Sequence, residues 1–360
     1  MKKRYLFLDM LRALAVAEMI HGHSLEGLLD TALRSTPFFV NWTHVRGYTA
    51  PVFLFAAGFA FALATLPRVD EYSKFSKTLL TRLRRLFFVV LLGYLMYLPY
   101  FSLRQTILSI GTSGWDNLLR VDILRCIGVS ALFLQLWFLL KPKRIATWIV
   151  VGAITIALPI LTPVVRQSDF VLNLPAFIRY YFVDSRFPLF YYASFLFLGF
   201  MLGSLFTNRQ GSWLKYSVIA AVLLILFGQV LNWSGALYAL RGFITRGGVI
   251  ILLTVLLERG ERLWERMPRA VKYFGKESLV VYVVHLMIIY GSVLNRGLVS
   301  YWGRTLSYSE VYLFVVWLFA AMVILAYFWH KLKLEHMPVA HWVKNTIYWS
   351  FLALFLLKPH

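Results

Sequence analysis

Two residues in the first apolar stretch of the chain, Arg12 and His23, have side chains and a spacing that could support chemistry. They lie eleven positions apart, close to three helical turns, so a helix would carry both on one stripe, about 16 Å apart along its axis. Because histidine titrates near neutral pH, His23 can accept a proton from a hydroxyl or an amine. The stripe suits a ligand with an anionic part near Arg12 and a reactive end near His23.

The same stretch carries three further ionisable residues, Asp9, Glu18 and His21. Asp9 lies one helical turn before Arg12, so the two can pair on one face. This pair either neutralises itself or takes part in binding a substrate. His21 is two residues from His23 and points about 200° away around a helix, so we assign no role to His21 or Glu18.

Two later apolar runs carry polar candidates. His285 lies within one run, with Tyr282 one helical turn earlier, and the two are expected either to bind a substrate or to bond another helix. Arg125 and Asp122 open the other run. Because a guanidinium group makes directional bonds to oxygen, Arg125 is a candidate for holding an anionic or polyhydroxyl ligand. The alternative is an interfacial aromatic belt with arginines that only set topology.

The composition indicates which elements must position these side chains. The chain has 360 residues, is 60% hydrophobic and only 15% charged, and has a mean hydropathy of +0.68. Soluble domains are about one-quarter charged, so this chain has too little polar surface to face water. Its long apolar runs fit a bilayer core, which needs roughly 20 residues per helix. We therefore expect an all-α polytopic transmembrane bundle that forms a single domain over residues 1–360.

The apolar runs predict about ten or eleven transmembrane spans. The expected spans are 5–25, 50–66, 86–102, 121–140, 145–162, 187–206, 214–232, 243–257, 277–294 and 310–329. A weaker run at 346–357 either spans or lies along the surface. The first run resembles a signal peptide, but its charges and the absence of a small-residue cleavage site predict a retained helix.

The basic residues predict the orientation. With the N-terminus in the cytoplasm, 23 Lys and Arg residues fall on the inner side and 12 on the outer side, as the positive-inside rule requires. We expect a multi-pass protein of a bacterial cytoplasmic (inner) membrane. Anionic lipid then explains the net charge of +21 without a nucleic-acid partner. A lone Cys126, scattered histidines and the lack of a P-loop argue against disulfides, metal sites and ATP hydrolysis.

Three motifs in order resemble the signatures of the membrane acyltransferase superfamily, which includes the acyltransferase-3 proteins and the heparan-α-glucosaminide N-acetyltransferase-like proteins. The first is LDMLRALAVAEMIHGH, in which Arg, ten residues and His match Arg12 and His23, and Asp9 matches the preceding acid. The second is APVFLFAAGF at 50–59, with Ala57 where the family commonly has Ser. The third is GKESLVVYVVH at 275–285, which ends on His285.

The resemblance implies an acyl-CoA donor, such as acetyl-CoA, on the cytoplasmic side and no permanently bound cofactor. It implies transfer to a hydroxyl or amine of a glycan, a lipid-linked sugar or a small metabolite near the outer side. His23 would be the base or a transient acyl carrier, and Arg12 would orient it or contact the donor. The heparan-glucosaminide branch places a histidine ahead of a turn like GYTA at 47–50, so His44 is a second catalytic candidate.

Two other functions remain open from the sequence. Asp9, Arg12 and His285 could serve as proton-relay or substrate groups of a transporter or of a lipid or glycan flippase. The chain could also be a non-catalytic membrane partner of another enzyme. Coenzyme A binding would separate an acyltransferase from both.

Overall fold

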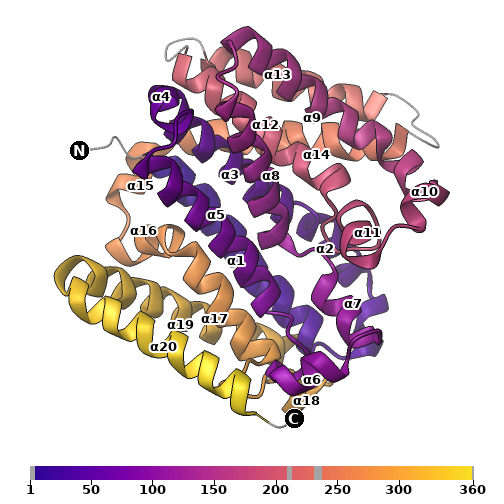
Figure 1. The fold of residues 1–360 in the computed structure, drawn as a ribbon, viewed down its shortest axis with the longest axis vertical. Helices are drawn as coiled ribbons and strands as arrows, with labels where there is room; N and C mark the ends of the chain where they lie inside the picture. The colour runs from indigo at the N-terminus through magenta and orange to yellow at the C-terminus, as the bar shows by residue number, and fades with distance from the viewer. Residues whose placement is uncertain (1–4, 209–212, 231–236, 359–360) are drawn as a thin grey trace. The chain divides into compact units, whose positions relative to one another are not determined.

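The computed structural model describes residues 5–208, 213–230 and 237–358, and all regular elements in these ranges are helices. This confirms the expected all-α class. The chain divides into two compact units, drawn together in Figure 1. The first comprises Met1–Thr49, Leu98–Trp115 and Leu257–His360, and the second comprises Ala50–Tyr97 and Asp116–Leu256. The expectation of a single domain stays a prediction.

The first unit is built around its N-terminal helix. Its helices are α1 (Leu6–Leu28), α2 (Pro37–Arg46), α6 (Leu103–Leu108), α15 (Glu261–Arg266), α16 (Arg269–Lys276), α17 (Ser278–Tyr290), α18 (Val299–Trp302), α19 (Tyr308–Glu335) and α20 (Met337–Leu357). Helix α1 packs against α16, α17 and α19. Its apolar side chains Phe7, Leu11, Val16 and Ile20 are completely buried, so α1 forms the centre of this unit.

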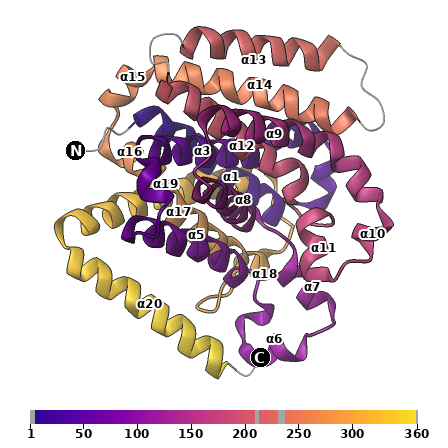
Figure 2. The same ribbon diagram turned by 45° about the horizontal axis from the view of Figure 1, so that its top comes forward.

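Local sequence signals fix the C-terminal helices of the first unit. A capping box starts α19, because the Ser307 hydroxyl accepts the Glu310 N–H and the Glu310 carboxylate accepts the Ser307 N–H. The chain reverses at His336, and α19 and α20 run close together in Figure 1, whereas Figure 2 shows that they diverge away from the turn. Only Ala340 of α20 is buried, so most of this helix presents its side chains outward.

The second unit holds most of the longest apolar helices. Its helices are α3 (Thr49–Thr65), α4 (Val69–Tyr72), α5 (Lys77–Leu95), α8 (Ile123–Leu139), α9 (Arg144–Gln167), α10 (Asp169–Leu172), α11 (Ala176–Phe182), α12 (Leu189–Asn208), α13 (Trp213–Val230) and α14 (Tyr238–Arg259). A short helix, α7 (Ser113–Leu119), runs across the boundary between the units.

Glycine permits a close helix contact in the second unit. A Cβ atom at Gly58 of α3 would collide with the backbone of Leu196 in α12, and one at Gly199 of α12 would collide with the backbone of Phe55 in α3. Small residues at facing positions are typical of helices that pack in lipid. The AAGF sequence at 56–59 therefore has a packing role.

Helices α13 and α14 also lie side by side (Figure 2).

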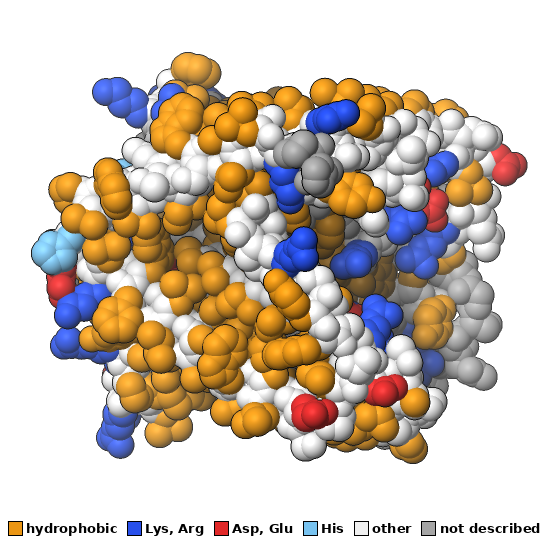
Figure 3. Space-filling model, turned by 90° about the horizontal axis from the view of Figure 1, so that it is seen from below, with side chains coloured by type: hydrophobic (Ala, Val, Ile, Leu, Met, Phe, Trp, Pro, Cys, Tyr) orange, Lys and Arg blue, Asp and Glu red, His pale blue; other side chains and the backbone are white. Residues whose placement is uncertain are grey.

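Several of the described helices are suited to a bilayer. Six are long and apolar enough to cross a membrane, or up to eight if each of two bent pairs is one span. The bent pairs are α7 with α8, at 46°, and α16 with α17, at 82°. The face drawn in Figure 3 carries broad hydrophobic areas with scattered Lys and Arg. The chain is thus an integral multi-pass protein, while the expected ten or eleven spans and the cytoplasmic N-terminus stay predictions.

The structure corrects one expected span. Helix α5 starts at Lys77, where the Ser76 hydroxyl accepts the Leu79 N–H, and ends at Leu95. The expected span 86–102 is therefore placed too late. Pro99 follows the helix, and Tyr100 adopts a positive φ of 51°, so the backbone cannot continue as an α-helix.

Candidate functional site

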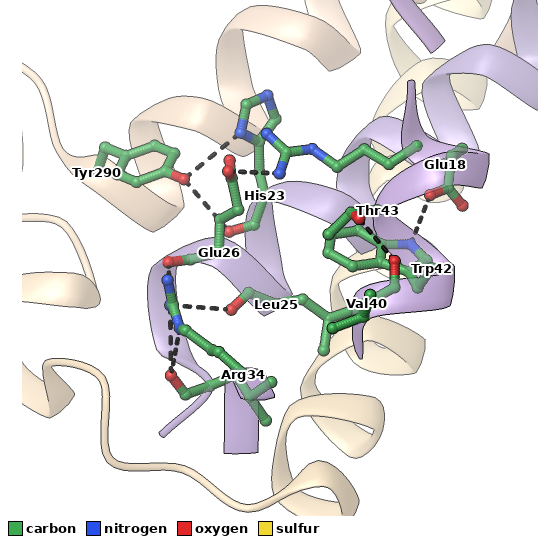
Figure 4. Close-up of polar contacts among 11 residues, drawn as sticks. Glu18, His23, Leu25, Glu26, Arg34, Val40, Trp42, Thr43 and Tyr290 are labelled. Carbon is green, nitrogen blue, oxygen red and sulfur yellow. Dashed lines mark hydrogen bonds and ion pairs between the residues drawn. The ribbon is translucent and has the colours of Figure 1, made fainter. Parts of the chain in front are cut away.

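Helix α1 carries the first group of candidates, and contacts within the first unit hold both of its ends. At its start, the Leu6 N–H donates to Glu261 Oε1 at 2.8 Å. At its end, the Arg34 guanidinium reaches back to backbone carbonyls, with the shortest bond, 2.6 Å, to the Glu26 oxygen (Figure 4). Helix C-terminal carbonyls lack partners within the helix, so Arg34 satisfies them and fixes the end of α1 next to His23.

The two residues near the start of α1 pair with each other as their spacing predicts. Arg12 Nη1 lies 3.7 Å from Asp9 Oδ1, and the Asp9 side chain is almost fully buried. A Cβ at Gly275 in α16 would collide with the Asp9 carbonyl oxygen. This glycine therefore lets α16 press directly onto the turn of α1 that carries the pair.

The structure brings three of the predicted site residues together: His23, His285 and Tyr282. The imidazole rings of His23 on α1 and His285 on α17 lie 5.5 Å apart between centroids, and the Tyr282 ring lies 5.9 Å from that of His285. Tyr290, at the end of α17, joins them. Its hydroxyl lies 3.4 Å from His23 Nδ1 and 3.3 Å from the His23 carbonyl oxygen (Figure 4). These four side chains are called the histidine pair site below.

The surroundings of His285 assign its tautomer. Its Nδ1 lies 2.8 Å from the Val281 carbonyl oxygen, which can only accept, so Nδ1 carries the proton. The neutral ring then has a lone pair on Nε2. That atom is buried and has no hydrogen-bond partner among the described residues. A buried acceptor without a partner is costly, so His285 has capacity for one further hydrogen bond.

The second catalytic candidate, His44, is not brought to this site. Helix α2 faces α1 with Trp42 and Arg46: Trp42 Nε1 donates to Glu18 Oε1 at 2.8 Å, and Arg46 Nη1 lies 2.5 Å from Glu26 Oε1. His44 lies halfway between these two positions, which puts it on the opposite side of α2, and it is exposed.

His21 and Glu18, to which the sequence assigned no role, belong to a polar cluster of their own. His21 Nδ1 lies 3.1 Å from Glu18 Oε2, and His21 Nε2 lies 3.3 Å from the Tyr312 hydroxyl on α19. The cluster joins α1, α2 and α19, with His21 pointing away from His23 as the helical spacing predicts. These contacts give both side chains, His21 and Glu18, a structural role.

The remaining predicted residue, Arg125, lies in the second unit. It is completely buried and pairs with Asp122, with 3.0 Å between Arg125 Nε and Asp122 Oδ1. Its Nη1 donates to the Leu118 carbonyl oxygen at 2.5 Å. A second pair in this unit, Arg179 and Asp184, is more exposed, with 3.8 Å between Arg179 Nε and Asp184 Oδ2.

Sequence reasoning missed two groups. Tyr290 carried no signal beyond its place at the end of an apolar run, which is also typical of interfacial tyrosines. The second group is centred on Glu277, a buried carboxylate at the bend between α16 and α17 that accepts from His330 Nδ1 at 2.7 Å and from Lys333 Nζ at 2.6 Å. Within the described ranges, no three His, Cys, Asp or Glu side chains are grouped to hold a metal ion.

Comparison with known families gives one match. The acyltransferase-3 family model, described as an acyltransferase domain, matches residues 5–331. No match was found among curated proteins. The matched range takes in α1, α17 and nearly all of α19, and so includes every residue of the histidine pair site.

Proposed function

Because this chain belongs to the acyltransferase-3 family, and is thus a membrane acyltransferase, we propose that His23 is the general base that activates its acceptor. The donor in this proposal is an acyl-CoA, such as acetyl-CoA, bound from the cytoplasmic side. The acceptor is a hydroxyl or amine of a glycan, a lipid-linked sugar or a small metabolite on the outer side. Acyl-CoA acts as a co-substrate rather than a resident cofactor.

One observation carries the assignment of His23. Its ring lies 5.5 Å from that of His285, a second imidazole whose Nε2 is buried without a hydrogen-bond partner in the described part of the chain. Two imidazole rings this close can both contact the same small reacting group. His23 is only partly buried, so its imidazole can exchange protons with a bound acceptor.

The proposed reaction follows from these positions. The imidazole of His23 takes the proton from the acceptor O–H or N–H as that atom forms a bond to the thioester carbonyl carbon. The C–S bond then breaks, and the imidazolium gives its proton to the departing coenzyme A sulfur, which leaves as a thiol. His285 Nε2 accepts a hydrogen bond from a second O–H or N–H group of the acceptor and so positions it, and the Tyr290 hydroxyl holds the His23 ring by its contact at Nδ1.

Arg12 has a separate role in this proposal. It lies on the same unbroken helix as His23, three turns away, and its side chain is 27% exposed beside Asp9. A fixed guanidinium at this place suits an anionic part of the donor. Asp9 holds the Arg12 side chain in position. Transport without chemistry, the alternative from the sequence, draws no support from the family assignment.

The test uses the full chain in nanodiscs, with acetyl-CoA labelled in its acetyl group and acceptor fractions extracted from the expressing cells. We expect thiol release with matched appearance of label in one fraction, and loss of both in His23→Ala. Uptake of a solute by proteoliposomes without thioester consumption would favour transport. Transfer at the wild-type rate in His23→Ala would remove His23 from the mechanism.

A further inference from the structure

The second unit contains a buried ion pair that the proposed reaction does not use. Asp122 is the N-cap of α8 and accepts the Arg125 backbone N–H at 3.0 Å; the same oxygen, Oδ1, accepts Arg125 Nε at 3.0 Å. Arg125 is 0% and Asp122 only 2% exposed. Burying two charges is costly even when they pair, so a pair kept this deep needs further partners or a function.

The pair has hydrogen-bonding capacity left on both members. A guanidinium has five N–H donors; Nε and Nη1 of Arg125 are used, but Nη2 is buried with no partner among the described residues. Oδ2 of Asp122 is likewise buried and has no hydrogen-bond partner among the described residues. One charged donor and one charged acceptor are therefore left unsatisfied on one ion pair, and such groups are rare in native proteins.

Tyrosines surround the pair. The Arg125 Cζ lies 4.5 Å from the centre of the Tyr94 ring and 5.6 Å from that of Tyr97. The Tyr94 hydroxyl lies 3.0 Å from that of Tyr181, and burial raises the pKa of Tyr181, which keeps this phenol able to donate. A Cβ at Gly93 would meet Asp122 Oδ1 at 2.6 Å, so α5 lies directly against the pair.

The opposite charges at the two unpartnered atoms, Arg125 Nη2 and Asp122 Oδ2, indicate which kind of ligand fits. An anion such as phosphate would meet the Asp122 carboxylate, and a cation would meet the Arg125 guanidinium. A neutral hydroxyl suits both, because it accepts one hydrogen bond and donates another. Aromatic faces beside such a site pack against the C–H groups of a sugar or polyol ring.

We propose that the Asp122–Arg125 pair is a binding site for a hydroxyl group of a neutral polyhydroxyl ligand, which accepts from Arg125 Nη2 and donates to Asp122 Oδ2. Tyr94 and Tyr97 form the aromatic wall of this site. The inference does not rest on the proposed function. The binding itself requires neither the donor nor His23.

Asp122→Asn is the variant that isolates the proposed contact. Asparagine is as good an N-cap as aspartate, and its side-chain oxygen can still accept from the Arg125 backbone and Nε. Its amide nitrogen replaces Oδ2, so the acceptor for the ligand hydroxyl becomes a donor. Elution as a single monodisperse species in size-exclusion chromatography confirms that the variant folds.

The experiment measures saturable binding of methyl α-glucoside, methyl α-galactoside and myo-inositol by isothermal titration calorimetry, with the protein in nanodiscs to avoid sugar-based detergents. We expect at least one probe to bind wild type, and to bind Asp122→Asn about 10-fold or more weakly. No saturable binding of any probe, or equal affinity in Asp122→Asn, overturns the proposal and leaves an ion pair that is only structural. Because calorimetry without an acyl donor measures binding without transfer, failure here is distinct from failure of the proposed reaction.

Discussion

The imidazole rings of His23 and His285 lie 5.5 Å apart, on helices α1 and α17 from opposite ends of the chain. Each ring is held from one side: Tyr290 contacts His23, and the Val281 carbonyl accepts from His285 Nδ1. The His285 ring is completely buried, whereas the His23 ring is only partly so. The pair thus combines one ring, His23, that can exchange protons with another, His285, that can only accept a hydrogen bond.

His285→Phe separates binding from packing at this site. Phenylalanine keeps an aromatic ring of similar size and leaves no unsatisfied nitrogen, so we expect thermal stability within a few degrees of wild type. Loss of the Nε2 hydrogen bond should lower kcat about 10-fold or more. Thiol release and thermal unfolding are measured on the same preparation. Unchanged kcat in a stable variant would make His285 a core residue without a role in transfer.

Tyr290→Phe removes only the hydroxyl that contacts His23. One hydrogen bond contributes about 1 kcal/mol, so we expect kcat to fall roughly fivefold while KM for the donor stays the same. Tyr301→Phe is the matched control, because Tyr301 is 66% exposed in the same unit. An equal fall in both variants would show that the effect does not come from the His23 contact.

Gly275→Ala tests the contact of α16 with the Asp9 turn. The added methyl group would collide with the Asp9 carbonyl oxygen, and overpacking of this kind costs about 1–3 kcal/mol. We expect a clear fall in the unfolding temperature in detergent. Gly152→Ala is the control, since its Cβ would meet only Met201, at 3.5 Å. Equal unfolding temperatures in the two variants would mean that α16 does not press on α1 as described.

Glu277→Gln tests the bend between α16 and α17. The variant leaves Lys333 and His330 without their shared carboxylate, and breaking a buried pair costs about 3–5 kcal/mol. We expect the low end of that range, because Lys333 is 38% exposed. The unfolding temperature should recover in part in Glu277→Gln/Lys333→Met. If the double variant is no more stable than Glu277→Gln, the loss does not come from an unpaired lysine.

Structural features that depend only on residues close together in the sequence could be predicted from it. Helix α1, the Asp9–Arg12 pair and the opposite directions of His21 and His23 all follow from helical spacing, and the structure contains each of them. The all-α class follows from composition. The end of α5 was placed too late because the apolar run continues past Leu95, although Pro99 was a signal to stop.

Tertiary partners were beyond sequence reasoning. Nothing in the spacing of α17 shows that Tyr290 reaches His23, and Glu277 finds His330 and Lys333 only because α19 packs on α16. Glu18 was set aside for the same reason, since its partner Trp42 lies on another helix. These contacts depend on how helices pack, which a periodicity within one segment does not specify.

The most direct test of the central claim compares His23→Asn with His21→Asn. Both changes replace an imidazole on α1 by a smaller amide, two residues apart, but only His23 faces His285. If His23 is the general base, kcat for acyl transfer falls roughly 10²–10⁴-fold in His23→Asn and less than about threefold in His21→Asn, with wild-type coenzyme A affinity in both. Equal rates in the two variants, or a larger loss in His21→Asn, would contradict this role.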